Sequence, residues 1–220
     1  MKPSSAPLDL PARALFDFAV PVHRKPTGLV IDGDLSDWPE ASRLPDLGAI
    51  DGSPGFAAVY LTWDAKGLYV AVDVPGKTTV AGNRQRPQTA DALFLWIDTR
   101  DVRDALRAGR FCHHFIALPR GAGRTRATAW QAPIQRAREQ APIGDPSHLT
   151  VASAIRRDGY SLELALPASA LNGYDPAECS RLGFTYMITD LDHGTQLWNV
   201  PSGIPFGHDP STWAAIELGE

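Results

Sequence analysis

Two pairs of segments have the hydrophobic pattern of β-hairpins. Residues 57–63 and 68–74 are rich in strand-forming valine, leucine, tyrosine and tryptophan, whereas in residues 149–155 and 160–166 every second position is apolar, with Ser153 as the exception. A period of two puts these side chains on one face of a strand. Each short connection ends in a glycine, which favours a tight turn. The pattern therefore predicts two β-hairpins.

Further segments show the β-branched and aromatic composition that is typical of strands. The run 91–98 (DALFLWID) is bulky on both faces, which predicts a central strand with Leu93, Leu95 and Ile97 buried. The other predicted strands begin at Leu29, cover 111–118 and 124–130 around a turn at 119–121, cover 181–190 and 214–218, and lie near Leu197. About nine to eleven strands at this spacing are expected of a sandwich or a jelly roll.

Helices are predicted only as short insertions. Residues 100–109 place Val102, Ala105 and Leu106 at helical spacing before a glycine, which predicts a short surface helix, and residues 167–171 fit one helical turn. The chain of 220 residues holds 19 glycines and 19 prolines, which suits strands joined by tight turns. We therefore predict an all-β, antiparallel, jelly-roll-like β-sandwich, with a loose leader at 1–14 and a single domain at 15–220.

Charge and targeting signals restrict the partners and the location. The formal net charge of −4 gives no reason to expect a nucleic-acid or membrane partner. Prolines and acidic residues interrupt the first 22 residues before a secretion signal can form, so a cytoplasmic location is the default expectation. The two cysteines, Cys112 and Cys179, form no disulfide framework, although one bridge between them stays open.

The order of these segments resembles the family 9 carbohydrate-binding modules and the wider group of DOMON-like sandwich domains. The resemblance covers nearly all of residues 28–220. It is carried by VIDGDLSDWPEA, AAVYLTWDAKGLYVAVDV, DALFLWIDTRD, HHFIALPRGAG, GYSLELALPASAL, LGFTYMITDLDHGTQLW and DPSTWAAIEL, in that order.

The resemblance implies an antiparallel sandwich that binds sugars through aromatic rings, often carries structural calcium and often accompanies glycosidases. Similar modules have a tryptophan three residues before the strand 91–98 and a glutamate within it. Gln88 and Phe94 stand at these two places, so the sugar clamp lacks one side.

Aromatic residues near the end of the chain supply a candidate carbohydrate site. Exposure is expected for the loop that holds Trp198 and Phe206, because it is rich in proline and glycine, whereas burial is favoured for Trp96. A sugar ring stacks its C–H face on an aromatic ring and needs polar groups for its hydroxyls. The candidate site residues are Trp96, Trp198, Asn199, Phe206, His208 and Asp209.

Acidic residues cluster in the turn that contains Asp32, Asp34 and Asp37. Carboxylates at a turn are the ligands that calcium prefers, but the same residues form Asx-type turns that bond only to their own backbone. Calcium is therefore the one candidate cofactor, and the Asx turn is its alternative.

Several readings of the function stay open. The chain contains no nucleophile elbow, phosphate-binding loop, dinucleotide fingerprint or zinc-protease spacing, so we expect a non-catalytic binding module, with or without a glycoside hydrolase as partner. The arginines in the middle of the chain could bind an anionic glycan or an acidic partner, but we favour the interpretation that they form a solvated surface. The alternatives are a sandwich that has lost its sugar clamp and binds a protein partner, and a haem-binding DOMON-like domain that uses Met187.

Overall fold

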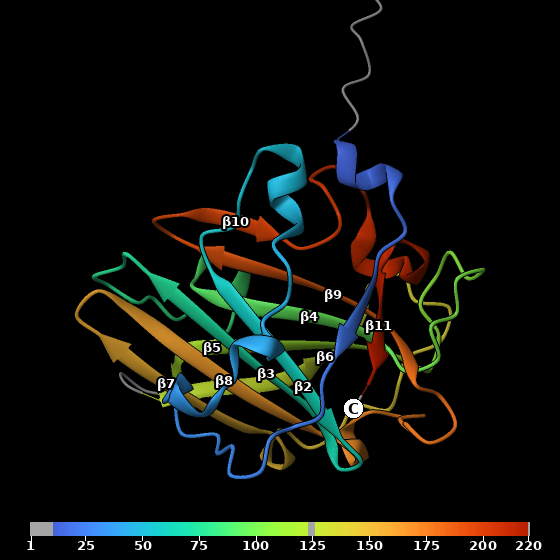
Figure 1. Cartoon of the computed structure of the whole chain (residues 1–220), viewed down its shortest axis with the longest axis horizontal. Helices are drawn as coiled ribbons and strands as arrows, with labels where there is room; N and C mark the ends of the chain where they lie inside the picture. The colour runs from blue at the N-terminus through green and yellow to red at the C-terminus, as the bar shows by residue number, and fades with distance from the viewer. Residues whose placement is uncertain (1–10, 123–125, 220) are drawn as a thin grey trace, which may run out of the picture.

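The computed structural model describes residues 11–122 and 126–219, which form two β-sheets packed face to face (Figure 1). The smaller sheet has four antiparallel strands in the order β2, β3, β8 and β7. Their bounds are β2 Ala58–Asp64, β3 Gly67–Pro75, β7 Thr150–Arg156 and β8 Gly159–Pro167. Both predicted hairpins are confirmed, and they lie side by side through β3 and β8.

The turn glycines of these hairpins are required by the backbone. Gly67 and Gly159 both have φ of 154°, and a Cβ at either position would collide with a carbonyl oxygen of the neighbouring strand. A side chain would therefore strain both hairpins at the point where they meet.

The larger sheet has seven strands, in the order β1, β11, β9, β4, β5 and β6, with the short β10 also paired to β9. All its pairs are antiparallel except that of β1 with β11. Their bounds are β1 Ala19–Val22, β4 Ala92–Asp98, β5 Cys112–Ala122, β6 Arg126–Ala132, β9 Arg181–Asp190, β10 Gly194–Leu197 and β11 Ala214–Leu218. The predicted all-β sandwich is confirmed.

The main core fills the space between the two sheets. Leu93, Leu95 and Ile97 of β4 point into it and are fully buried, as predicted. The alternate residues Phe94 and Trp96 lie on the outer face of the larger sheet, in a second apolar cluster. This outer face is also covered, which explains why β4 is bulky on both faces. The residues that cover it come from loops and from the residue before β11: Ala108, Ile134, Ala137, Phe206 and Trp213.

Three local predictions are wrong. No strand begins at Leu29, because the amides that follow it bond to side chains: that of Val30 to Asp37 and that of Asp32 to Glu163. Residues 100–109 form turns and bends, not a helix. No turn lies at 119–121, since β5 continues to Ala122.

The helical segments among the described residues are 3₁₀ turns, and the one predicted at 167–171 is confirmed as η7. Their bounds are η1 Ala12–Leu15, η2 Leu35–Asp37, η3 Glu40–Ser42, η4 Leu47–Asp51, η5 Pro87–Thr89, η6 Pro146–His148, η7 Ala168–Ala170, η8 Phe206–His208 and η9 Pro210–Thr212. Within residues 11–122 and 126–219, no helix has the length and apolarity that crossing a membrane requires.

The N-terminal segment is packed on the sandwich from residues that the sequence assigned to the loose leader at 1–14. Arg13 is buried, pairs with Asp51 at 2.7 Å, and donates from Nη1 to the carbonyl oxygens of Leu197 and Trp198 at 2.8 Å. Residues 1–10 of the predicted leader lie outside the described residues. The part from Ala12 onward is held in place by a buried charge.

Candidate functional site

The structure separates the aromatic residues that the sequence grouped together. Trp198 lies in the main core with 1% of its surface exposed, so the expectation that its loop exposes it is wrong. Its ring stacks on Tyr186 with 5.9 Å between centroids, and its Nε1 donates to the carbonyl oxygen of Pro45 at 2.9 Å. A ring held in this way offers no face to a ligand.

Trp96 and Phe206 do meet, but as packing on the outer face of the larger sheet. Trp96 is buried, as favoured from its sequence position, and stacks on His114 with 4.5 Å between centroids. The half-buried Phe206 touches Trp96 edge to face at 5.0 Å. This pair therefore closes the second apolar cluster.

The three polar candidates serve different parts of the same loop. Asp209 caps η9 by accepting from the backbone amide and the hydroxyl of Ser211. The carbonyl oxygen of His208 accepts from the amide of Ala108. Only Asn199 of the six candidates lines the pocket described below, where its Nδ2 donates to the carbonyl oxygen of Thr212 at 2.8 Å.

The acidic turn follows the geometry of the Asx alternative. Asp32 accepts from the amide of Asp34, Asp34 from that of Ser36, and Asp37 from that of Val30. Among residues 11–122 and 126–219, no three His, Cys, Asp or Glu side chains are arranged to hold a metal ion. The three carboxylates are thus not gathered around a common point, and calcium binding by this chain stays a prediction.

Glu163 of β8 fixes the same turn from the sheet. Its carboxylate accepts from the indole Nε1 of Trp38 at 2.6 Å and from the amides of Asp32 and Gly33. Burial raises the pKa of Glu163, although these three donors favour the charged form. The conspicuous turn sequence is therefore explained by its attachment to β8.

The cysteine and histidines of β5 are uncharged at neutral pH. Burial and, to a lesser degree, the charge of Asp98 raise the pKa of the Cys112 thiol to about 12. Burial lowers the pKa of His113 and of His114 to about 4. Both Cys112 and Cys179 are free, so the bridge that the sequence left open is absent.

The structure places the two positions at which the sequence departs from the expected sugar clamp in different surroundings. Gln88 is exposed in η5, and Phe94 is buried on the outer face, where it stacks on Trp96 with 6.3 Å between centroids. No aromatic side chain replaces Gln88 within η5.

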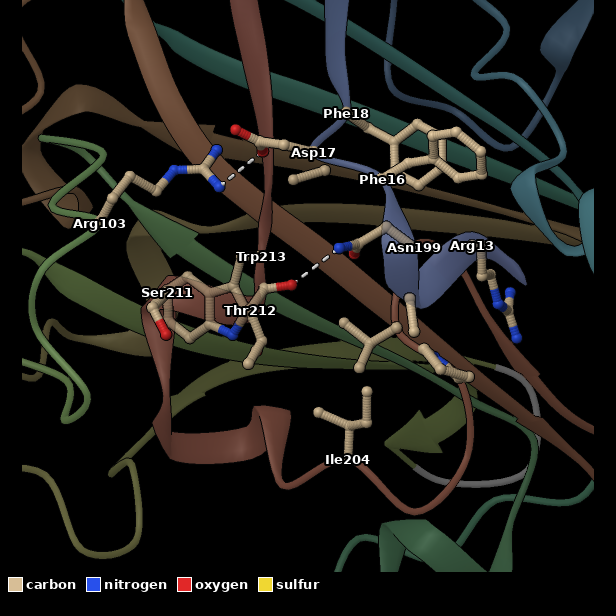
Figure 2. Close-up of a pocket in the computed structure, with 14 residues that line it drawn as sticks. Arg13, Phe16, Asp17, Phe18, Arg103, Asn199, Ile204, Ser211, Thr212 and Trp213 are labelled. Atoms are coloured by element: carbon tan, nitrogen blue, oxygen red, sulfur yellow. Dashed lines mark hydrogen bonds and ion pairs between the residues drawn. The ribbon is translucent and has the colours of Figure 1, made fainter. Parts of the chain in front are cut away.

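A pocket of about 360 Å³ lies between the N-terminal segment and the loop after β10 (Figure 2). We call it the N-terminal pocket. The segment before β1 forms one wall, the loops after β4 and β10 form others, and the start of β11 forms the floor. Its lining residues are Arg13, Ala14, Phe16, Asp17, Phe18, Arg103, Asn199, Val200, Pro201, Ile204, Ser211, Thr212, Trp213 and Ala214.

Two phenylalanines give this pocket an accessible apolar side. Phe16 has 59% of its surface exposed, and its ring lies 6.0 Å from that of the half-buried Phe18 (Figure 2). The carbonyl oxygen of Phe18 accepts from the amide of Ala215, which fixes the segment against β11. Phe16 is therefore a free ring on an anchored backbone.

Two of the residues that line the pocket carry polar atoms with unused hydrogen-bonding capacity. The buried Oδ1 of Asn199 and the buried Nη2 of Arg103 have no hydrogen-bond partner in the described part of the chain. Arg103 is held by Asp101 at 2.6 Å and by Asp17 at 3.1 Å, the second of which is drawn in Figure 2. An acceptor and a donor in fixed positions suit a ligand that carries hydroxyl groups.

Most residues of this pocket carry no signal in the sequence, with one exception. Phe16, Phe18 and Val20 alternate with other residues at the period of a strand, which would have predicted β1 and the position of the two rings. No local signal marks Arg103 as their neighbour, because 84 residues separate it from Ala19 and it reaches this segment through its ion pair with Asp17.

Comparison with known proteins places the chain among carbohydrate-binding domains. A family model described as carbohydrate family 9 binding domain-like matches residues 31–220. A family 9 carbohydrate-binding module from Caldicellulosiruptor kristjanssonii in complex with cellotriose is 18% identical, with 91% of this chain and 93% of that chain covered and a TM-score of 0.63. A family 9 module from the same organism in complex with glucose is 17% identical, with 91% of this chain and 95% of that chain covered and a TM-score of 0.61. At this identity the two structures show a shared fold. No curated protein matches the chain.

Proposed function

Because this chain belongs to the carbohydrate family 9 binding domain-like family, we propose that it binds a carbohydrate in the N-terminal pocket and does not transform it. The observation that carries the proposal is the pairing of an exposed aromatic ring with fixed polar atoms that have no partner in the described residues. A pyranose needs both kinds of contact at once.

Phe16 supplies the stacking surface in this proposal. The C–H face of a sugar packs on the ring, and Phe18 behind it extends the apolar side. Phe16 lies before residue 31, where the family match begins, so this platform belongs to the chain's own N-terminal segment.

Asn199 and Arg103 supply the directional contacts. The Oδ1 of Asn199 would accept from a sugar hydroxyl and the Nη2 of Arg103 would donate to one. Both atoms are buried in the structure, so these contacts require the side chains to turn toward the ligand. The hydroxyls of Ser211 and Thr212 line the same wall. Such groups fix the orientation of the ring and discriminate between epimers.

The acid content of the pocket supports binding without hydrolysis. Glycoside hydrolysis commonly requires two carboxyl groups on opposite sides of the bond that breaks. Asp17 is the only carboxylate among the described residues that line the pocket, and it is paired with Arg103.

Titration calorimetry tests the proposal directly. Glucose, cellobiose and cellotriose form the first panel, since the structural neighbours hold glucose and cellotriose. We expect saturable binding that Phe16→Ala weakens about tenfold, equivalent to about 1.4 kcal/mol. Leu15→Ala is the matched control, because Leu15 is 70% exposed and lies outside the pocket lining. Equal binding by wild type and Phe16→Ala would show that the sugar does not use this pocket.

A protein-binding role is the second candidate, and one observation favours it. Gln88 and Phe94 leave the expected clamp incomplete, while Leu15 and Phe16 together form an exposed apolar pair. If titrations with a broad glycan panel are all flat, cross-linking from a reactive group placed at residue 15 would test whether a partner covers this pair.

A further inference from the structure

A second hollow lies among the loops after β4 and β6. It is close to the N-terminal pocket along the chain, since Val102 and Pro210 line this hollow and the next residues, Arg103 and Ser211, line that pocket. It has a volume of about 310 Å³ and continues into a shallower hollow of about 400 Å³ through the shared residues Arg110, Phe111 and Glu139. We call the two together the arginine groove. Its lining residues are Asp98, Val102, Ala105, Arg107, Gly109, Arg110, Phe111, Cys112, Arg138, Glu139, Gln140, Pro142, Asn172 and Pro210.

Three guanidinium groups line this groove and lack carboxylate partners. Arg107, Arg110 and Arg138 are exposed, and none of them forms an ion pair in the described part of the chain. By contrast, Arg103 and Arg181 nearby share Asp101, at 2.6 and 2.7 Å. The arginines of the groove therefore keep their hydrogen-bonding capacity free.

The acidic residues of the groove do not cancel this charge. Asp98 is buried, and its two oxygens accept from the amides of Arg100 and Val102. Glu139 is the one exposed carboxylate among the described lining residues, and its side chain pairs with no arginine in them. Three cations thus face one exposed anion.

The backbone beneath the arginines is fixed, which pre-organises the charged wall. The amide of Arg138 donates to the carbonyl oxygen of Ala108, and the amide of Ala108 donates to that of His208, both at 2.8 Å. Ala108 is fully buried in the second apolar cluster. Because Arg107 precedes Ala108 and the amide of Arg138 bonds to it, the backbone positions from which the two exposed side chains extend are fixed by the core.

The groove also offers contacts that a free inorganic anion does not need. Phe111 lies at its centre as a half-buried ring, with the guanidinium groups of Arg100 and Arg110 at 5.5 and 5.0 Å from its centroid. Gln140 and Asn172 extend the groove with amide groups. Amides and an aromatic edge beside cations are the contacts that a charged sugar requires.

We propose that the arginine groove binds a saccharide that carries carboxylate or sulfate groups, such as an oligomer of uronic acid. The proposal rests on carbohydrate binding by this chain but not on the N-terminal pocket. A guanidinium fork matches the two oxygens of a carboxylate, so Arg107 and Arg138 hold the anionic group while Phe111 and Asn172 contact the ring. Selectivity for acidic over neutral sugars follows from the net positive wall.

Titration calorimetry of the whole chain with trigalacturonate at low salt tests this proposal, with cellotriose and sodium sulfate as separate ligands. We expect Arg107→Gln/Arg138→Gln to weaken trigalacturonate binding at least tenfold. The control Lys66→Gln/Arg157→Gln removes the same charge from exposed positions outside the groove and should change affinity less than twofold. Glu139→Gln should strengthen binding two- to threefold, because it removes the one exposed anion.

Further arms separate this proposal from the proposed function and from simple anion binding. Arg138→Lys should recover only part of the affinity, since a lysine lacks the planar fork. Cellotriose binding, where present, should respond to Phe16→Ala and not to the groove variants. Equal loss in groove and control variants, or sulfate binding as tight as trigalacturonate binding, would overturn the acidic-saccharide groove. Absence of cellotriose binding alone would overturn only the N-terminal pocket.

Discussion

The buried Lys77 and the three arginines of the arginine groove show how differently this fold treats positive charge. Lys77 has 1% of its surface exposed, and its Nζ lies 3.0 to 3.1 Å from carboxylate oxygens of Asp91, Asp190 and Asp192. The arginine groove holds three cations at the surface with one exposed anion. One group is fully compensated inside the protein, and the other is left for something outside it.

The aspartates around Lys77 are themselves held by the backbone. Asp91 accepts from the amides of Ala81 and Leu191, and Asp190 accepts from those of Asp192 and His193. Burial acts to lower the pKa of Lys77, but the hydrogen bonds to its three carboxylates outweigh it and raise the pKa. The ammonium therefore ties the segment before β4 to the turn between β9 and β10.

The comparison teaches that compensation, and not charge, separates structural from ligand-binding cations in this fold. A buried cation whose every proton has a carboxylate acceptor stabilises the protein only as part of its network. An exposed guanidinium without a partner contributes little to stability and is free to bind.

The largest effect is expected from Lys77→Met. Removal of the cation leaves Asp91 and Asp190 buried without their partner, which should lower the free energy of unfolding by about 3 to 5 kcal/mol. Urea denaturation at pH 7 measures the loss. Arg107→Met and Arg138→Met should each change stability by less than about 0.5 kcal/mol. A comparable loss of stability in the arginine variants would contradict the view that only Lys77 has a structural role.

Buried imidazoles show what burial does without carboxylates. Burial lowers the pKa of His113 and His114 to about 4, so between pH 6.5 and 4 the unfolded chain binds protons that the folded chain does not. Stability should therefore fall as the pH drops through this range, by about 3 kcal/mol for each histidine at its lower end. His114→Phe keeps a ring against Trp96, and denaturation at several pH values should show about half of this fall. An unchanged slope would contradict a neutral His114.

A smaller effect is expected when the loss of unfolding free energy in Lys77→Met is compared at different pH values. Burial would raise the pKa of Asp190, but the amides of His193 and Asp192 and the Lys77 ammonium outweigh it and hold that pKa below its usual value. The stability that Asp190 contributes is thus present above its unfolded pKa and lost as the pH falls through the folded one. Without Lys77 the buried Asp190 takes up a proton more readily, so the difference between wild type and variant should shrink by about 1 to 2 kcal/mol from pH 7 to pH 4.5. A constant difference would mean that Lys77 acts only through packing.

The smallest effect is expected at the acidic turn, where carboxylates have no cation. Asp34→Ala removes the cap of η2 and should lower the free energy of unfolding by about 1 kcal/mol. We expect millimolar calcium to leave the melting temperature of wild type unchanged, because the three carboxylates already accept from backbone amides. A rise in melting temperature that Asp34→Ala abolishes would instead establish a calcium site.

Local patterns in the sequence were sufficient for the architecture but not for the site. The alternation in β7 and β8, the glycines that end both hairpin turns and the apolar row of Leu93, Leu95 and Ile97 all report contacts within a few residues or a period of two. Such signals survive in a single sequence because neighbouring residues and one strand face determine them. The proline and glycine content of the loop with Trp198 is also a local signal, but it predicted exposure and Trp198 is buried.

The sequence by itself determined that this chain forms a two-sheet β-sandwich of the family 9 type, with its turns and most of its strands in the right places. Only the tertiary structure decided which aromatic rings face solvent, that Arg13 anchors the N-terminal segment, and that Arg107 and Arg138 share a wall. The physical reason is that exposure and charge compensation depend on partners distant in the chain, which the parallel pairing of β1 with β11 and the packing of loops onto the outer face bring together.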